Sequence, residues 1–569
     1  MSNSDPLSDP IWRTHYAHPG DWDRVFAPLT IPQMFDASVA AYPDAILSDF
    51  LGAQLRYATI GVLVDRFAAA LVVQGLVKGD RVGLYLPNVP DYLIAYYGAL
   101  KAGAIIVNMS PLYSREELTH QVRDSGVRLM VTTDVPQLYA TASALLDSGV
   151  IERIVVGSLS GWLPLGKRIL FRLFKRGQIA RIPTGNPRIV RVSAMIDPTQ
   201  SDAPVIAVDP DDVALIQYTG GTTGVPKGAM LTHQNLTANA RQVHAIDPHQ
   251  EMPDRIVGAL PFFHVFANTC VLNRTVLSGG MIAMVPRFDA GQVLATIARV
   301  KATALPGVPT MYQALLDHPK MGTTSFASLR VCISGGAPLA GALKQKFEAA
   351  TGAHVVEGYG LTESAGVVSC NPYQGANKDG TIGQPVAGTL VRLVDREDPT
   401  RPAPPGEPGE LVFEGPQVMK GYWGRPETNA ETFVGRALRS GDVATIDAEG
   451  YIRIVDRLKD MIAVGGFKVF PSQIEAMLYR NPAVKEAIVI GIADDYHGEV
   501  PKAFVTLNEG ASMDGAALKA WLNPQLGKHE RVAAVDVRAE LPKTLVGKLS
   551  RKELVAEERA KIAQASPSS

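Results

Sequence analysis

The stretch Tyr218-Thr-Gly-Gly-Thr-Thr-Gly-Val-Pro-Lys-Gly228 follows an apolar run, Val213–Gln217, that is typical of a buried strand. Three glycines and three threonines in six residues let backbone N–H groups and hydroxyls approach a ligand closely, and Lys227 adds a positive charge. We interpret the stretch as a phosphate-binding loop. It is not a Walker loop, because Pro226 precedes the lysine and Gly228 follows it. A surface turn rich in glycine and threonine is the simpler alternative.

Helical and strand-like runs alternate on both sides of this loop. Residues 64–74, 81–86, 92–101 and 105–108 are typical of helix, strand, helix and strand in turn, and 213–218, 256–260 and 330–334 of further strands. This alternation predicts an α/β fold whose large N-terminal domain has layered β-sheets flanked by helices. The longest apolar run, 93–109, is interrupted by Lys101 and is too short to span a membrane.

The pattern changes after about Asp456. Pro471 precedes Ser472-Gln-Ile-Glu475, a capping-box spacing that predicts a helix start. Residues 487–492 and 503–507 then resemble strands, and 514–522 a helix, so we expect a small, mobile α+β C-terminal domain. The predicted division is an extension at 1–30, a large domain at 31–456, a hinge at 457–460 and a small domain at 461–569.

The bulk composition describes a globular protein of more than one domain. The chain has 569 residues, of which 46% are hydrophobic and 20% charged, and a formal net charge of −1, which does not indicate a nucleic-acid partner. The three widely spaced cysteines, Cys270, Cys332 and Cys370, form no CxxC pair and are expected to be buried thiols. The polar N-terminus has no signal-peptide pattern. We therefore expect a cytoplasmic protein.

Three further segments suit the binding of a nucleotide. Ile333-Ser-Gly-Gly-Ala-Pro-Leu339 offers flat backbone for a planar ring, and Glu357-Gly-Tyr-Gly-Leu-Thr-Glu-Ser364 offers an aromatic ring, a hydroxyl and a carboxylate. Ser440-Gly-Asp442 offers an acid beside a glycine, which suits two ribose hydroxyls. Each segment is weak evidence alone, but their order and spacing together predict a site for an adenylate.

These segments resemble the adenylate-forming superfamily of acyl-CoA synthetases, luciferases and peptide-synthetase adenylation domains, over about Phe35 to Leu554. Within it the chain is most similar to bacterial long-chain fatty acid–CoA ligases. The closer match is carried by Val107–Tyr113, Tyr218–His233, Gly415–Trp423 and Arg453–Met461. The resemblance implies ATP-dependent activation of a medium- or long-chain fatty acid to acyl-AMP, then transfer to coenzyme A, with Mg²⁺ as cofactor.

The resemblance also implies roles for individual residues. Lys548, Glu363, Lys227 and Thr362 would be catalytic, and Glu363 would bind the metal. Lys459 would be the hinge, Gly465 and Gly466 would line the coenzyme A tunnel, and His264 would lie at the acyl pocket. The residues that would bind the nucleotide are Thr219, Gly220, Gly221, Thr222, Thr223, Gly224, Gly335, Gly336, Ala337, Tyr359, Asp442 and Arg457.

Several of these residues have simpler interpretations. Glu363 could cap a following helix, Lys227 and Lys548 could be solvated surface lysines, and His264 could be a structural histidine in an aromatic cluster. The chain also departs from the family pattern. The segment before Asp442 lacks the usual tryptophan and threonine, although Ser440 keeps a hydroxyl, and Lys528-His-Glu-Arg531 replaces a more usual Tyr-Lys form.

A basic, amphipathic stretch at residues 161–176 has no counterpart in the family pattern. It interleaves Lys167, Arg168, Arg172, Lys175 and Arg176 with large apolar residues, and no acid occurs between Arg153 and Ile196. Such a helix can lie on an anionic membrane, which would place the protein peripherally on the inner face of the cell membrane. The alternative is a cover helix packed on the large domain.

The leading hypothesis is a fatty acid–CoA ligase whose partners are fatty acid, ATP and coenzyme A, with a homodimer as a further expectation. A ligase for an aryl or short-chain acid, or one that loads a carrier protein, is the nearest alternative. A non-catalytic acyl- or nucleotide-binding protein is a remote one, because pure binding needs neither Glu363 nor Lys548.

Overall fold

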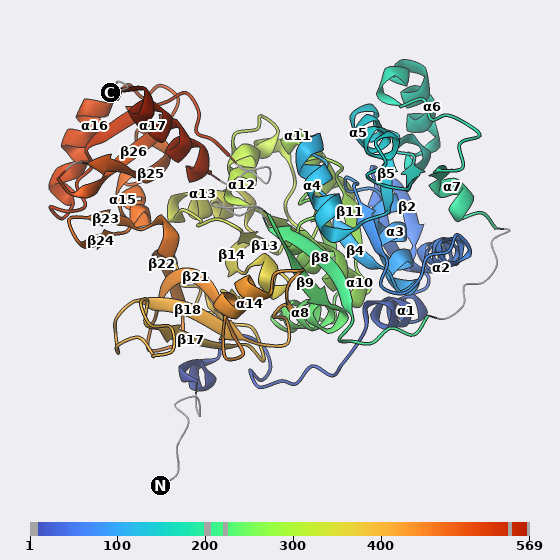
Figure 1. Cartoon of the computed structure of the whole chain (residues 1–569), viewed down its shortest axis with the longest axis horizontal. Helices are drawn as coiled ribbons and strands as arrows, with labels where there is room; N and C mark the ends of the chain where they lie inside the picture. The colour runs from blue at the N-terminus through green and yellow to red at the C-terminus, as the bar shows by residue number, and fades with distance from the viewer. Residues whose placement is uncertain (1–9, 199–205, 220–225, 495, 544–548, 566–569) are drawn as a thin grey trace, which may run out of the picture.

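The structure is a computed structural model that describes residues 10–198, 206–219, 226–494, 496–543 and 549–565. Figure 1 shows two large sheets with their helices, a third sheet beside them, and a separate small unit formed by the C-terminal part of the chain. The predicted α/β class is therefore confirmed.

The first large sheet carries the strand that precedes the proposed phosphate loop. Its central strands are parallel, whereas β9 and β19 are antiparallel additions at one edge. In spatial order the strands are β19 (Gly421–Tyr422), β9 (Lys227–Thr232), β8 (Val213–Thr219), β4 (Ile105–Asn108), β3 (Arg81–Leu84), β5 (Leu129–Thr133), β6 (Arg153–Gly157) and β7 (Ile189–Arg191).

The second large sheet has nine strands. It is parallel from β14 through β12 and on to β1, with short antiparallel strands at both edges. In order these are β16 (Gln384–Pro385), β15 (Ser369–Cys370), β14 (His354–Tyr359), β13 (Val331–Gly335), β12 (Ala304–Gly307), β10 (Arg255–Gly258), β11 (Met281–Met284), β1 (Ile46–Phe50) and β2 (Ala53–Arg56).

Helices connect and cover these sheets, and α3 is buried on nearly every side. As expected, the apolar run 93–109 forms the end of a helix and then the buried strand β4. The helices are α1 (Ile31–Ala41), α2 (Tyr57–Val73), α3 (Pro90–Lys101), α4 (Arg115–Ser125), α5 (Pro136–Asp147), α6 (Leu165–Phe174), α7 (Val192–Met195), α8 (His233–Ala245), α9 (Val265–Ala267), α10 (Arg274–Leu277), α11 (Ala290–Val300), α12 (Pro309–Leu316) and α13 (Gly341–Thr351), with the π-helix η4 (Asn268–Asn273) and the 3₁₀ turns η1 (Ile11–His15), η2 (Ser160–Trp162), η3 (Arg176–Gln178) and η5 (Met321–Thr323).

A third, antiparallel sheet follows, and then the small unit. The third sheet contains β17 (Leu390–Val394), β18 (Gly409–Glu414), β20 (Phe433–Val434), β21 (Ala437–Ile446) and β22 (Ile452–Arg457). The helix α14 (Pro426–Thr432) directly precedes β20, and the turn η6 (Thr362–Ser364) lies between β14 and β15 of the second sheet. After the turn η7 (Leu458–Asp460), the small unit contains β23 (Ile462–Val464), β24 (Phe467–Val469), α15 (Pro471–Leu478), β25 (Val484–Asp494), β26 (Gly498–Leu507), α16 (Gly515–Leu522), η8 (Asn523–Gln525), β27 (Ala534–Val537) and α17 (Arg551–Ala565).

The small unit has hydrophobic clusters of its own. One contains Ile474, Val489, Val505 and Leu518, and its members all lie between Ile462 and Val535. The main cluster of the rest of the chain extends over both large sheets and the third sheet. The two units therefore have separate cores, as two domains do.

The helix predicted to start at Ser472-Gln-Ile-Glu475 is confirmed, since α15 begins one residue earlier, but the predicted capping box does not form. The helix begins at Pro471 after Phe470, which makes no capping hydrogen bond through its side chain. The Ser472 hydroxyl instead donates to the carbonyl of Val455, and Glu475 is paired with Arg551. The side chains of Ser472 and Glu475, which a capping box would use, are therefore both engaged in contacts with distant residues.

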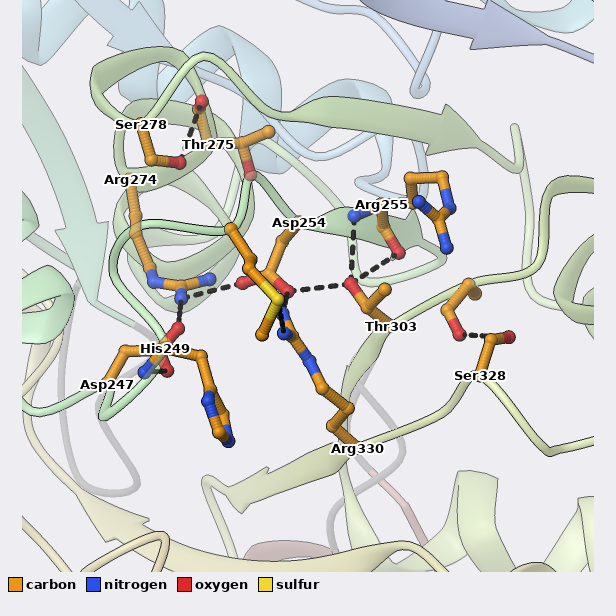
Figure 2. Close-up of polar contacts among 12 residues, drawn as sticks. Asp247, His249, Asp254, Arg255, Arg274, Thr275, Ser278, Thr303, Ser328 and Arg330 are labelled. Atoms are coloured by element: carbon orange, nitrogen blue, oxygen red, sulfur yellow. Dashed lines mark hydrogen bonds and ion pairs between the residues drawn. The ribbon is translucent and has the colours of Figure 1, made fainter.

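A buried ion-pair network supports the second sheet (Figure 2). The Arg274 guanidinium contacts both Asp247 and Asp254, and Asp254 also accepts hydrogen bonds from Thr303 and Arg330. Burial alone would raise the pKa of Asp254, but its cationic partners hold that pKa below the usual value. The three cysteines are free and buried, as expected.

Candidate active site

Three of the sequence-predicted nucleotide residues lie at the carboxyl ends of strands, where open α/β sheets place their ligands. Thr219 ends β8, Gly335 ends β13 and Tyr359 ends β14. Because β13 and β14 are parallel neighbours that pair Gly335 with Gly358, their ends lie side by side. Strand β8 also contacts the turn η6 (Thr362–Ser364), which follows β14 about 140 residues later.

Close packing explains the glycine at position 335. A Cβ atom there would lie 3.1 Å from the ring of Phe266, and the next residue, Gly336, has a φ of +79°. A side chain at either position would be strained or crowded. Gly336 is exposed and Ala337 half-buried, so backbone at this strand end is open to a flat ligand.

Asp442 is buried and both of its carboxylate oxygens have partners. The Tyr359 hydroxyl donates to Oδ2, and Arg457 Nε lies 2.9 Å from Oδ1. Burial raises the pKa of Asp442, and the Arg457 guanidinium partly offsets that effect. Each carboxylate oxygen has two lone pairs, so Asp442 can still accept hydrogen bonds from a ribose.

Ser440 fixes the backbone before this acid. Its hydroxyl donates to the carbonyl of Leu411 at 2.6 Å and accepts the N–H of Asp442 at 3.0 Å. The family's usual tryptophan and threonine are absent here, but the Ser440 hydroxyl is kept. Its hydrogen bonds within the protein orient Asp442.

Lys227 and Glu363 meet at one aromatic side chain, Tyr422. The Tyr422 hydroxyl donates to Glu363 Oε1 at 2.6 Å, and Lys227 Nζ lies 4.5 Å from the centre of the Tyr422 ring. Thr362 and Glu363 form η6, and no capping hydrogen bond of the Glu363 side chain occurs there among the described residues. The helix-cap alternative for Glu363 is thus not supported.

The arrangement fits a magnesium ion bound mainly through substrate. Among the described residues there is no cluster of three His, Cys, Asp or Glu side chains that could hold a metal. Mg²⁺ is commonly held by one or two carboxylates together with the phosphates of a nucleotide. Glu363 has one oxygen, Oε2, that takes no hydrogen bond within the described part of the chain, and it can serve as such a ligand.

The segment between the two cores carries Lys459 in the turn η7. Burial and the neighbouring Arg457 lower the pKa of Lys459. Gly465 and Gly466 form the two-residue turn between β23 and β24, with φ of +55° and +87°. Positive φ at both positions is what such a hairpin requires, which accounts for the two glycines.

His264 has a structural role in this conformation. It lies at the N-terminal end of α9, where its Nδ1 accepts the N–H of Phe266 at 3.3 Å. Gly220, Gly221, Thr222, Thr223, Gly224 and Lys548 lie outside the described residues.

Two side chains in the site were missed as candidates. Tyr422 lies in the Gly415–Trp423 stretch, and Glu357 opens the segment that contains Tyr359. Glu357 is largely buried and accepts the N–H of Leu339 at 3.2 Å, and burial raises its pKa to about 7. Glu357 could have been found from the sequence, because it is an acid directly before the glycine-rich segment Gly358-Tyr-Gly360.

Comparison with known proteins agrees with this geometry. The model of the AMP-binding enzyme family matches residues 35–423, and that of the AMP-binding enzyme C-terminal domain matches residues 473–548. A long-chain-fatty-acid–CoA ligase of Bacillus subtilis is 38% identical over 550 residues, covering 96% of this chain and 98% of that protein. A feruloyl-CoA synthase of an Amycolatopsis species is 37% identical over 504 residues, covering 88% and 94%. The crystal structure of ATP-bound MatB from Rhodopseudomonas palustris superposes with a TM-score of 0.80 at 29% identity, covering 93% and 99%.

Proposed function

Because this chain belongs to the family of AMP-binding enzymes, we propose that it is an AMP-forming fatty acid–CoA ligase. In the first half-reaction a fatty acid carboxylate attacks the α-phosphate of ATP, which gives acyl-AMP and pyrophosphate. In the second the thiol of coenzyme A displaces AMP, which gives acyl-CoA. The observation that carries this proposal is that Asp442 contacts both Tyr359, at the end of β14, and Arg457, which lies within electrostatic range of Glu363.

The chemistry explains why charge is gathered here. A carboxylate and a phosphate repel each other, so the site has to offset negative charge while it aligns the two groups. Lys227 supplies positive charge, and Asp442 would hold the ribose so that the α-phosphate is fixed in place. Bound through Glu363, Mg²⁺ would neutralise phosphate oxygens. Thr219 to Gly224 would hold the β- and γ-phosphates, and Thr362 would contact the α-phosphate.

We assign the two half-reactions to two arrangements of a large domain, 31–456, and a small domain, 461–569, about a hinge at 457–460. Lys548 would serve adenylate formation, and the Gly465–Gly466 turn would line the coenzyme A tunnel. The separate hydrophobic cores on either side of η7 support this division. A homodimer remains a prediction, which light scattering of the purified protein will test.

The acid is proposed to be a medium- or long-chain fatty acid, with His264 at the mouth of its pocket. Each buried methylene contributes about 0.8 kcal/mol, so affinity rises with chain length until the pocket ends. The relatives that bear the name long-chain-fatty-acid–CoA ligase support this choice, and the feruloyl-CoA synthase supports an aryl acid as the alternative.

Analysis of the products tests the function. Purified protein is incubated with ATP, Mg²⁺, coenzyme A and one acid from a panel of palmitate, octanoate, acetate and ferulate, and the nucleotides are separated by chromatography. We expect AMP and pyrophosphate, with the highest kcat/KM for a fatty acid. ADP as the main product would refute an adenylate mechanism, whereas a preference for ferulate would establish the aryl alternative.

A second proposal is that α6 docks the enzyme on an anionic membrane. Five of its large apolar side chains are 56–79% exposed, namely Leu165, Ile169, Leu170, Leu173 and Phe174, whereas Phe171 is half-buried. They recur at i, i+4 and i+8 spacing, so they share one face. Figure 1 shows α6 at the outer edge of the molecule beyond α5, and its main packing neighbours are the adjoining turns η2 and η3. The cover-helix alternative requires this face to be packed against the protein, so it is not supported.

Positively charged residues beside the apolar face of α6 favour an anionic membrane as its partner. Lys175 and Arg176 are exposed beside it, and no acidic residue occurs in residues 153–196. Basic side chains that flank an apolar helix face attract anionic lipids, each contributing about 1 kcal/mol near the surface. Among the described residues no helix is long and apolar enough to cross a bilayer. Contact would therefore be peripheral.

Vesicle sedimentation tests this contact. Lys175→Glu/Arg176→Glu and Leu173→Ser/Phe174→Ser should each reduce binding to phosphatidylglycerol vesicles at least fivefold, and salt should reduce binding by the wild type. Lys320→Glu, at an exposed lysine outside α6, is the control. Activity on octanoate should be unchanged in all variants. Wild-type binding by both double variants would refute the proposal.

A further inference from the structure

Backbone hydrogen bonds hold Tyr422 in place independently of its side chain. The two residues of β19 pair with β9, placing Gly421 opposite Met230 and Tyr422 opposite Ala229. The side chain of Asn429 accepts the N–H of Tyr422 at 2.7 Å and donates to its carbonyl at 3.2 Å. The next residue, Trp423, donates to the carbonyl of Gly228 at 2.8 Å. Tyr422 is therefore fixed to the strand that Lys227 begins.

The Tyr422 side chain connects two segments that the proposed chemistry needs together. Its hydroxyl donates to Glu363 Oε1 at 2.6 Å, and its ring lies 4.5 Å from Lys227 Nζ. A hydrogen bond to a charged acceptor is stronger than a neutral one, and an ammonium over a ring face is attracted by the ring quadrupole. Because the backbone N–H of Met419 also donates to the Glu363 carbonyl at 2.8 Å, Glu363 is tied to the same segment twice.

Such contacts restrict what Glu363 can do. With Oε1 engaged by a phenol, the carboxylate offers Oε2 as one ligand and is hindered from binding a metal through both oxygens. The ring likewise limits the positions of the Lys227 ammonium, which would otherwise sample many rotamers. Tyr422, which is not among the expected catalytic residues, thus restricts both the Glu363 carboxylate and the Lys227 ammonium.

We propose that Tyr422 is a positioning residue for adenylate formation: its hydroxyl fixes Glu363 as a single-oxygen ligand of the metal–ATP complex, and its ring holds Lys227 ready for the phosphates. This inference rests on the proposed function. It assigns Tyr422 no contact with the reacting atoms.

Two substitutions separate the two contacts. Tyr422→Phe removes the hydroxyl and keeps the ring, whereas Tyr422→Leu removes both. A matched control is Tyr451→Phe, since Tyr451 also has a lysine over its ring, with Lys378 Nζ at 4.2 Å, and a hydroxyl that donates to the Ala376 carbonyl at 2.7 Å.

Metal binding is measured directly, without turnover. Mn²⁺ replaces Mg²⁺, and its affinity for the enzyme–ATP complex is determined by electron paramagnetic resonance without acid or coenzyme A. Tyr422→Phe should weaken Mn²⁺ binding by roughly tenfold, as expected for loss of a charge-assisted hydrogen bond. Tyr422→Leu should in addition weaken ATP binding in the absence of metal, because Lys227 is released. Tyr451→Phe should match the wild type in both measurements.

A double-mutant cycle identifies the partner. In a Glu363→Gln background, Tyr422→Phe should cause no further loss of Mn²⁺ affinity, because the hydroxyl acts through that carboxylate. Additive losses, or wild-type Mn²⁺ affinity in Tyr422→Phe, would overturn the inference. Failure of the wild type to form acyl-AMP or acyl-CoA would instead refute the proposed function, and that outcome is scored in a separate assay. A circular dichroism melt of each variant detects any loss of folding, and Tyr422→Phe alone decides the result if Tyr422→Leu does not fold.

Discussion

Arg457 and Asp442 form an ion pair, 2.9 Å from Nε to Oδ1, just before the chain enters η7. A second ion pair, 3.3 Å from Arg551 Nη1 to Asp460 Oδ2, holds the last residue of η7. The first joins two strands of the third sheet, and the second connects the end of η7 to α17 of the small unit. The backbone between the two units is therefore anchored on both sides of Leu458 and Lys459, and we predict that any rotation of the small unit occurs at these two residues.

The first prediction concerns Asp442. Asp442→Ala should raise the dissociation constant of ATP by about 10- to 100-fold, since hydrogen bonds to a charged group contribute about 1.5–3 kcal/mol. The apparent affinity for palmitate should change much less. Isothermal titration with ATP and with palmitate compares the two. Equal losses for both ligands would indicate a folding role, consistent with the buried contacts to Tyr359 and Arg457.

The second prediction concerns the hinge anchor. Asp460→Asn removes one charge while Arg551 keeps its 2.6 Å contact with Glu475, so the small unit should stay folded. The loosened anchor should let the two units sample more orientations. Small-angle scattering should show a broader distribution of interatomic distances in the variant. Its free energy of unfolding should be lower than that of the wild type by at most about 1 kcal/mol. An unchanged distribution would show that Asp460 does not limit the motion.

The third prediction concerns the buried network of Figure 2. Asp254→Asn leaves Arg274 with only Asp247 and weakens the contact of Arg330. Removing one member of a buried ion pair costs about 3–5 kcal/mol, so unfolding of the large unit should move to clearly lower denaturant concentration. Asp44→Asn, at an exposed pair with Arg56, is the control and should have almost no effect.

The fourth prediction concerns pH. Burial lowers the pKa of His233 from 6.5 to about 4, and its Nδ1 accepts the N–H of Ile31, which only the neutral ring can do. The unfolded chain therefore binds a proton between pH 6.5 and pH 4 that the folded chain does not. Stability should fall with decreasing pH across that window, by about 1.4 kcal/mol per unit from this residue. His233→Gln should show a shallower decline in thermal midpoint between pH 7 and pH 5, whereas His354→Gln, at an exposed position, should match the wild type.

Much of this arrangement could be predicted from the sequence, because local patterns carry it. The alternation of apolar runs predicted β3, α3 and β4, and the glycine-rich segments lie at the ends of β8, β13 and β14, where we propose the site. Contacts between distant segments could not be predicted in this way. Ser472 has a capping pattern but bonds to Val455, and the meeting of Tyr422 with Glu363 depends on a two-residue strand that pairs only in the folded chain. The apolar face of α6 is exposed because no other segment that the structure describes packs on it, and this too could not be predicted from the local sequence.

The last prediction separates the two half-reactions. If Lys548 serves only adenylate formation, Lys548→Ala should slow acyl-AMP formation about 10²- to 10³-fold, the scale seen when one preorganised charge-stabilising donor is removed. The same variant, supplied with chemically prepared acyl-AMP, should still form acyl-CoA at a near-normal rate, because closure in the second orientation uses another face of the small unit. Lys543→Ala is the matched control. This lysine lies five residues earlier and pairs with Glu486 within the small unit at 2.7 Å, so its loss should leave both half-reactions near normal. Equal impairment of both half-reactions in Lys548→Ala would show that the small domain presents one face to both steps, and the assignment of two arrangements about Lys459 would then be wrong.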